Sequence, residues 1–142
     1  MKNTYPTNLT LPKVDLGLLV FRIAISGMML THGIPKLITL FGSGEIAFGD
    51  PIGLGSVTSF TLVLIAEFIC AILVLVGLGT RLAVIPLIID MTVAAFFYHL
   101  PEGFRTMEIP LLYLIGFGLL FFTGSGKYSL DYYFLSKDKK AV

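Results

Sequence analysis

The sequence has few of the residues on which soluble redox proteins and nucleic-acid binders depend. Of its 142 residues, 13% are charged, one is cysteine and none is tryptophan. The single Cys70 excludes a disulfide within the chain, and with it thiol–disulfide exchange between two of its own cysteines. No Cys/His spacing typical of zinc is present, and no flavin site is evident. The formal net charge of +1 provides no general basic field, so we expect no nucleic-acid partner.

Hydrophobic residues are abundant instead. They make up 56% of the chain, and the mean hydropathy of +0.90 lies outside the range of soluble domains. Four apolar runs each approach the roughly 20 residues that cross the hydrocarbon core of a bilayer. Backbone groups in lipid must pair within the segment, which favours helices over strands. The sequence therefore predicts an all-α membrane protein, a bundle of four transmembrane helices. The expected spans are residues 14–37, 57–79, 82–100 and 108–124.

Shorter segments flank and join these spans. Residues 1–13 are polar and lack the apolar core and cleavage site of a signal peptide, so we expect the first span to act as an uncleaved insertion signal. Residues 14–124 form the transmembrane domain. Residues 125–142 form a tail in which Ser129 is expected to cap a short interfacial helix. The glycine-rich stretch FGSGEIAFGDPIGLGS is either a lid over the mouth of the bundle or a flexible connector.

Basic residues predict the orientation of the bundle. Most of them fall on one side of the membrane, and the positive-inside rule places that side, with both termini, in the cytoplasm. The loops after the first and third spans then face outward. The basic residues on the cytoplasmic side are Lys2, Lys13, Arg81, Lys127, Lys137, Lys139 and Lys140, against Lys36 and Arg105 on the other side.

Three ionisable residues lie deep within the predicted spans: Arg22, Glu67 and Asp90. A charged group at the centre of a membrane helix costs roughly 2.5–3.5 kcal/mol on insertion scales, so we expect these side chains to face inward. One interpretation is a structural ion pair, such as Arg22 with Glu67. The other is a role in proton or ligand handling, because one arginine faces two carboxylates and one acid lacks an equal partner.

A second polar cluster is expected near the outward ends of the spans. His32 and His99 lie about 10 Å and 12 Å from the middles of their own spans, on the same side of the membrane. Together with Lys36, Tyr98 and Glu108 they either exchange protons with a bound small molecule or anchor the helix ends at the interface. On an ideal helix His99 lies 180° from Asp90. The two can line one cavity only if the helix bends or ends near Tyr98.

Four sequence motifs, which occur in a fixed order along the chain, resemble those of a known protein family. They are FRIAISGMMLTHGIPKL, AEFICAILVLVGLGTRLAV, DMTVAAFFYHLPEGF and GSGKYSLD. In this order they resemble the DoxX family of small four-helix bacterial membrane proteins, over roughly residues 16–131. The positions that match the motifs are Arg22, His32, Gly33, Lys36, Glu67, Arg81, His99, Tyr128, Ser129 and Asp131.

The resemblance implies a multi-pass protein of the bacterial cytoplasmic (inner) membrane and a link to quinone. Members are linked to thiosulfate:quinone oxidoreductase, and others occur beside superoxide dismutase and a sulfurtransferase in a membrane-associated redox complex. We therefore expect a quinone-linked redox protein or a subunit of a membrane oxidoreductase, with a redox protein as partner.

Residue roles follow from that hypothesis. His32, His99 and Glu67 would exchange protons with the ligand, and either histidine would hydrogen-bond a quinone carbonyl. Arg22, Lys36, Asp90, Tyr98 and Glu108 would bind or tune the site, and no residues are assigned to a metal. Two other functions remain open at this point: a non-catalytic scaffold that recruits soluble redox proteins, and a small proton-coupled transporter that would require a homo-oligomer.

Overall fold

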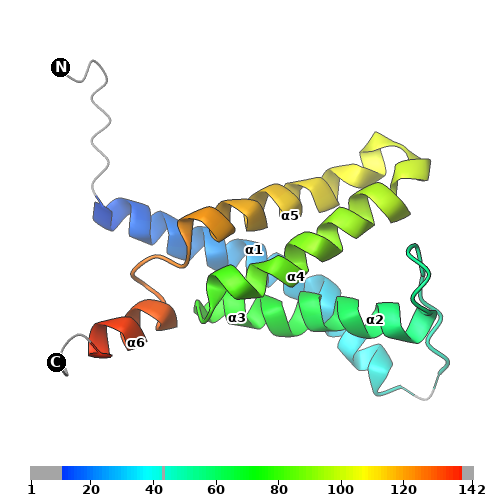
Figure 1. The fold of residues 1–142 in the computed structure, drawn as a ribbon, viewed down its shortest axis with the longest axis horizontal. Coiled ribbons are helices and arrows are strands. Elements are labelled where there is room, and N and C mark those ends of the chain that lie inside the picture. The colour runs from blue at the N-terminus through cyan, green and yellow to red at the C-terminus, as the bar shows by residue number, and fades with distance from the viewer. Residues whose placement is uncertain (1–10, 43, 139–142) are drawn as a thin grey trace.

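The structure is a computed structural model that describes residues 11–42 and 44–138. Four long helical segments run back and forth along one axis (Figure 1). The first is α1 (Leu11–Leu40), and the last is α5 (Phe104–Thr123). The predicted polar segment 1–13 lies mostly outside the described residues, and α1 already begins at Leu11.

The two middle segments each contain a π-helical stretch. In the second segment, α2 (Ser56–Leu64) passes through η1 (Ile65–Cys70) into α3 (Ala71–Val76). In the third, α4 (Thr80–Val93) passes into η2 (Ala94–Tyr98). A π-helical turn holds an extra residue and so changes which face the following side chains occupy.

Two short helices complete the fold. The 3₁₀ turn η3 (Leu100–Glu102) joins η2 to α5, and α6 (Leu130–Asp138) follows the last long helix. Pro101 stands in η3, as the predicted end of the third span requires. α5 begins at Phe104, four residues before the predicted start of the fourth span, and therefore carries Pro110 inside the helix.

Four of these segments are long and apolar enough to cross a membrane. They are Pro12–Leu40, Ser56–Val76, Thr80–Tyr98 and Phe104–Thr123. No β-strand occurs in the described part of the chain. The prediction of an all-α membrane protein with four transmembrane helices is confirmed.

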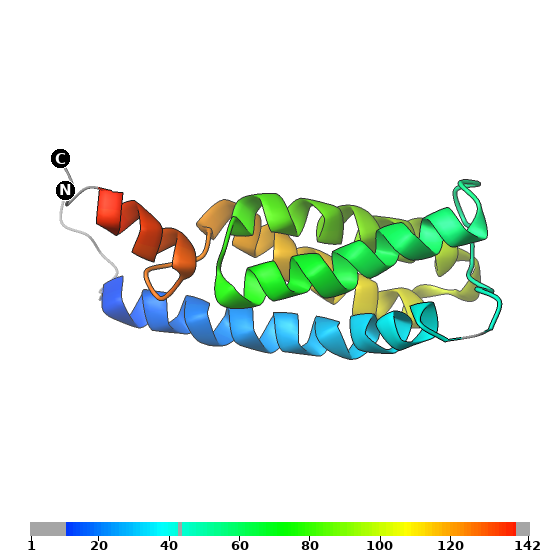
Figure 2. The same cartoon turned by 90° about the horizontal axis from the view of Figure 1, so that it is seen from below.

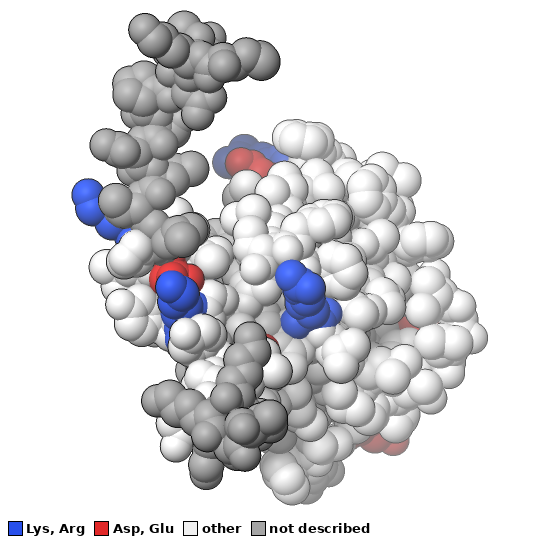
Figure 3. All heavy atoms as spheres, turned by 60° about the vertical axis from the view of Figure 1, so that its left-hand side comes forward, with Lys and Arg blue, Asp and Glu red and all other residues white. Residues whose placement is uncertain are grey.

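The two ends of the bundle differ in construction, and we name them by their contents. At the hairpin end, α1 begins, α3 turns into α4, and α5 leads into α6 (Figure 2). At the lid end lie the loop between α1 and α2 and the turn η3. Basic side chains stand apart from one another on the hairpin end (Figure 3), where the Lys127 ammonium lies 3.8 Å from the Asp15 carboxylate. Placement of this end in the cytoplasm stays a prediction.

Apolar side chains fill the centre of the bundle and also cover its outside. Met29, Val84, Leu87 and Phe117 are fully buried where the four segments meet. Large apolar residues on the outer faces remain exposed, for example Val20 and Ile115. Such a surface would be a liability in water, but it is the surface that lipid chains require.

Arg22 is almost completely buried, at 2% exposed, and it holds the hairpin end together. Its guanidinium donates to three backbone carbonyls: Leu75 at 3.3 Å, Ser125 at 2.6 Å and Tyr128 at 2.7 Å. The interpretation that pairs Arg22 with a membrane-embedded carboxylate is therefore wrong. The guanidinium pairs instead with backbone carbonyls near the ends of α3 and α5 that have no partner within a helix. Its three nitrogens point in different directions, so each can donate to a different carbonyl.

Asp131 completes this arrangement from the start of α6. Its carboxylate accepts the amides of Gly79 at 2.7 Å and Thr80 at 3.2 Å, and so caps the first turn of α4. Its own amide donates to the Gly77 carbonyl at 2.9 Å. We call Arg22, Asp131 and the segment 124–131 the clasp. The motifs GLGTRL and GSGKYSLD thus serve the same structural contact.

Ser129 caps α6 as the sequence predicts. Its hydroxyl accepts the Tyr132 amide at 3.2 Å while donating to the Gly126 carbonyl at 2.6 Å. Tyr132, Tyr133 and Phe134 project from α6 and are exposed, which suits a helix lying at the membrane surface.

The clasp makes a prediction about two glycines of the hairpin. Gly77 and Gly79 both have positive φ, at 73° and 59°, so alanine at either position is strained. A Cβ at Gly77 would lie 2.6 Å from an Arg22 guanidinium nitrogen, whereas a Cβ at Gly79 would meet nothing within 4 Å. Gly79→Ala should cost about 1–2 kcal/mol from backbone strain alone, and Gly77→Ala a further 1–3 kcal/mol from overpacking.

Thermal unfolding of the two variants in detergent micelles measures this difference. Gly79→Ala is the matched control because it carries the strain without the collision. Equal stability of the two variants would mean that the clasp does not pack against Gly77 as described.

Candidate ligand-binding cavity

A cavity of about 1080 Å³ lies in the half of the bundle nearer the lid end. Its walls come from α1, α2 with η1, α4 with η2, α5, and the loop between α1 and α2. Most of the lining is apolar, but one group of polar side chains faces the space. These are His32, Lys36, Glu67, Asp90, Tyr98, His99, Arg105 and Tyr113.

Glu67 is buried in the cavity wall and pairs with Lys36. The Lys36 ammonium lies 2.5 Å from a Glu67 carboxylate oxygen and 3.5 Å from the His32 carbonyl. The predicted alternative of an ion pair between Arg22 and Glu67 is thus replaced by a pair between Lys36 and Glu67. Side chains on a helix lean toward its N-terminus, so Lys36, near the end of α1, leans inward toward the depth of Glu67.

Gly33 allows this pair to form. A Cβ at this position would lie 2.5 Å from the Glu67 carbonyl oxygen and 2.9 Å from the Phe68 nitrogen. Any side chain here would push α1 away from η1. Because Gly33 has no side chain, α1 lies close enough to η1 for Lys36 to reach the Glu67 carboxylate.

Asp90 faces the same cavity from α4. One of its carboxylate oxygens is buried and has no hydrogen-bond partner among the described residues. A buried polar atom without a partner costs about 1–3 kcal/mol, which a ligand that hydrogen-bonds to it would recover. Asp90 thus offers a ligand a buried polar atom that no described residue already engages.

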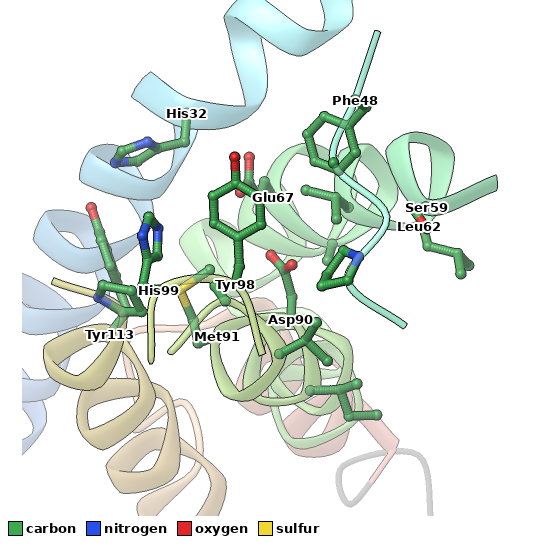
Figure 4. A pocket seen from close by; sticks show the side chains of 18 of the residues that line it. His32, Phe48, Ser59, Leu62, Glu67, Asp90, Met91, Tyr98, His99 and Tyr113 are labelled. Carbon is green, nitrogen blue, oxygen red and sulfur yellow. The ribbon is translucent and has the colours of Figure 1, made fainter. Parts of the chain in front are cut away.

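Asp90 and His99 line one cavity although an ideal helix would point them in opposite directions. The π-helical stretch η2 lies between them and ends at Tyr98, where the chain turns into η3. The helix thus departs from α geometry near Tyr98, as predicted for a chain in which Asp90 and His99 line one cavity. Figure 4 shows His32, Tyr113 and His99 on one side of the cavity and Asp90 on the other.

Aromatic contacts hold the two histidines in place. The His32 ring meets Tyr113 edge-on at 6.0 Å between centroids, and His99 meets Tyr98 edge-on at 4.9 Å. His99 Nδ1 also lies 3.0 Å from the Glu102 carboxylate, at the exposed end of η2. This contact links a histidine of the cavity lining to a solvent-exposed carboxylate.

Two residues proposed for the site lie elsewhere. Arg22 belongs to the clasp, and Glu108 is exposed on α5 and does not line the cavity. Met107 and Pro110 are the buried residues on that part of α5, so Glu108 points away from the bundle. Sequence reasoning missed Tyr113, which is one turn after Pro110 on the same buried face and could have been found by that spacing.

The loop between α1 and α2 covers the cavity, which favours a lid over a flexible connector. Residues 47–54, which we call the lid, contribute six residues to the lining. Phe48 packs edge-on against Phe60 at 5.5 Å between centroids. Gly49 lies against the Tyr98 ring, since a Cβ there would be 2.6 Å from it.

Asp50 fastens the lid to the start of α2. Its carboxylate accepts the amides of Gly55 at 2.7 Å and Leu54 at 2.8 Å, and the Ser59 hydroxyl at 2.9 Å. These donors, the Gly55 amide above all, hold the pKa of Asp50 below its usual value. A group with a lowered pKa stabilises the folded arrangement above its unfolded pKa of about 3.9.

The lid should therefore begin to lose stability as the pH falls below about 4, the pKa of Asp50 in the unfolded chain. The loss should be complete once the pH is below the lowered pKa of Asp50 in the folded protein. A spin label at Ile52, in a chain with Cys70→Ser, reports this as increased mobility. Asp50→Ala should show the mobile state at every pH. Glu45→Gln, an exposed carboxylate of the same loop, is the control and should behave like the parent protein. Mobility that is independent of both pH and Asp50 would contradict this role.

Comparison with known proteins agrees with the sequence and the fold. The sequence profile of the DoxX family matches residues 17–100, which include the first three transmembrane segments apart from the start of α1. The matched region holds Arg22, the Lys36–Glu67 pair, Asp90 and His99.

Two relatives extend the likeness over most of the chain. An uncharacterized membrane protein of Mycobacterium tuberculosis is 33% identical over 130 residues, covering 81% of this chain and 79% of its own. An uncharacterized protein of Haemophilus influenzae is 30% identical over 126 residues, covering 82% of this chain and 89% of its own. No solved structure matches the chain. The profile match and these relatives together show that the chain belongs to the DoxX family.

Proposed function

We propose that this DoxX protein binds a membrane quinone in the cavity and acts as a quinone-linked part of an oxidoreductase in the bacterial cytoplasmic membrane. The observation that carries the proposal is the buried Asp90 oxygen without a partner in a largely apolar space. Apolar walls with a few convergent polar groups are typical of small-molecule sites. The volume of about 1080 Å³ is near the upper end of such sites.

The chemistry of the lining suits a ligand that takes up protons together with electrons. A bound quinone would supply a ring that accepts two electrons and two protons to become a quinol. A protonated Asp90 would donate a hydrogen bond to one carbonyl of the quinone, and its carboxylate would accept one from a hydroxyl of the quinol. His32 or His99 would hydrogen-bond the other ring oxygen. The chain has a single cysteine and no flavin motif, so the electrons would come from a partner redox protein.

The arrangement of charges supports a role in proton exchange. Lys36 neutralises Glu67, so the pair adds no net charge to the cavity. Asp90 is left as the acid that can gain or lose a proton. His99 and Glu102 extend from the cavity to the exposed lid end and would relay that proton to water.

The proposed orientation places this exchange on the outer side of the membrane. Lys13, Arg81 and Lys127 lie at the hairpin end, and Arg105 lies at the lid end. By the positive-inside rule, the hairpin end would be cytoplasmic and the lid would face outward.

Asp90→Leu tests the proposal because leucine keeps the approximate volume and removes the polar atoms. We expect affinity for a decyl-substituted benzoquinone to fall about tenfold or more, the usual effect of losing a hydrogen bond to a charged or buried group. Asp90→Asn should keep most of the affinity, since the amide still forms hydrogen bonds. Calorimetry on the purified chain in nanodiscs measures both.

Glu108→Leu is the matched control. It removes an exposed carboxylate that lies closer to the lid end than Asp90 and does not line the cavity, so this variant should bind the probe like the unmodified protein. No saturable binding by the unmodified protein would overturn the proposal. Binding that is indifferent to Asp90→Leu, His32→Ala and His99→Ala would overturn it as well.

A further inference from the structure

The cavity reaches the side of the bundle between α2 and α4, where its lining forms an opening. At the lid end these helices diverge (Figure 1), and α4 packs on η1 and α3 but makes no extensive contact with α2. Residues from both helices that line the cavity are nevertheless exposed. Leu62 on α2 is 52% exposed, and Ile89 on α4 is 58% exposed. We call this opening the slot, bounded by Leu62, Ile65, Ile89 and Val93.

The slot opens at a depth where lipid chains lie. Ile89 is at the middle of the segment Thr80–Tyr98 and precedes Asp90 in the chain. Leu62 lies about 6 Å from the middle of Ser56–Val76, at 1.5 Å per residue. Both are well within the half-thickness of about 15 Å of the hydrocarbon core. All four residues that bound the slot are apolar, as a wall facing lipid requires.

The water side of the cavity is covered at the same time. The lid lies against Tyr98 through Gly49 and against Phe60 through Phe48. Figure 4 shows Phe48 and Tyr98 near the lid, with Leu62 on α2 at the edge of the same space and Asp90 within it. The geometry therefore favours access from the bilayer over access from water.

We propose that the ligand enters sideways through the slot and remains partly in it. Its polar head would meet Asp90, and a long apolar tail would lie between α2 and α4 among Leu62, Ile65 and Ile89. This rests on the proposed function and defines its substrate class more closely: a lipid-borne molecule with a compact ring and an isoprenoid or alkyl tail. A water-soluble head without a tail would use only the inner part of the cavity.

Two probes with the same head separate these parts. One is a dimethoxy-methyl-benzoquinone without a tail, and the other carries a decyl tail on the same ring. Leu62→Trp and Ile89→Trp narrow the slot without changing the polar groups. Each should lower affinity for the tailed probe about tenfold, because excluding roughly two methylene groups costs that factor. Affinity for the probe without a tail should stay unchanged.

Ile115→Trp is the control, since Ile115 on α5 is 69% exposed and does not line the cavity. It should leave the affinity for both probes unchanged. Leu62→Phe and Ile89→Phe add less volume and should give the same order of effects if the tryptophan variants fold poorly. A decyl probe with a photoreactive tail end should label peptides that contain Leu62 or Ile89.

The outcomes distinguish the two proposals. If both probes bind equally well and the slot variants change neither, entry through the slot is wrong while the cavity remains a quinone site. If the slot variants weaken both probes alike, the tail does not lie in the slot. If neither probe binds the unmodified protein, the proposed function fails and the slot proposal fails with it.

Discussion

The close contact of α1 with η1 is the constraint on which the cavity depends. Gly33 carries no side chain, so the two backbones meet beside Glu67. Lys36 then reaches the Glu67 carboxylate and removes the cost of a lone charge at the centre of the membrane. With Glu67 satisfied in this way, Asp90 is left as the unpaired acid of the cavity. Which acid of the cavity is paired and which is left unpaired therefore depends on a glycine that does not line the cavity.

The bundle separates structural roles from chemical ones along its length. At the hairpin end, Arg22 and Asp131 are engaged with backbone groups of three different segments. At the lid end, the polar side chains face a cavity instead. Both ends contain positions of the DoxX motifs. In this chain a motif residue is thus not by itself evidence of catalysis, because four of the ten motif positions belong to the clasp: Arg22, Tyr128, Ser129 and Asp131.

The transmembrane segments could be predicted from the sequence, because long apolar runs have few alternatives in lipid. The grouping of His32, His99 and Asp90 was accessible as well, once a bend near Tyr98 was allowed. The partner of Arg22 was not, because free carbonyls at helix ends carry no sequence signal. Glu108 was wrongly assigned to the site because its depth along the helix follows from the sequence, whereas the face of the helix on which its side chain lies does not. Tyr113 was missed among the many aromatic residues of an apolar helix.

The clasp also sets an order for the assembly of the protein. Asp131 caps the start of α4, yet about fifty residues of chain separate the two, including all of α5. During synthesis the first three segments can therefore enter the membrane before the residues that lock them exist. The Ser125 and Tyr128 carbonyls that accept hydrogen bonds from Arg22 are likewise synthesised about a hundred residues after it. The hairpin end closes last, when the C-terminal segment emerges, so a chain truncated before Ser125 would carry a buried arginine without two of its three acceptors.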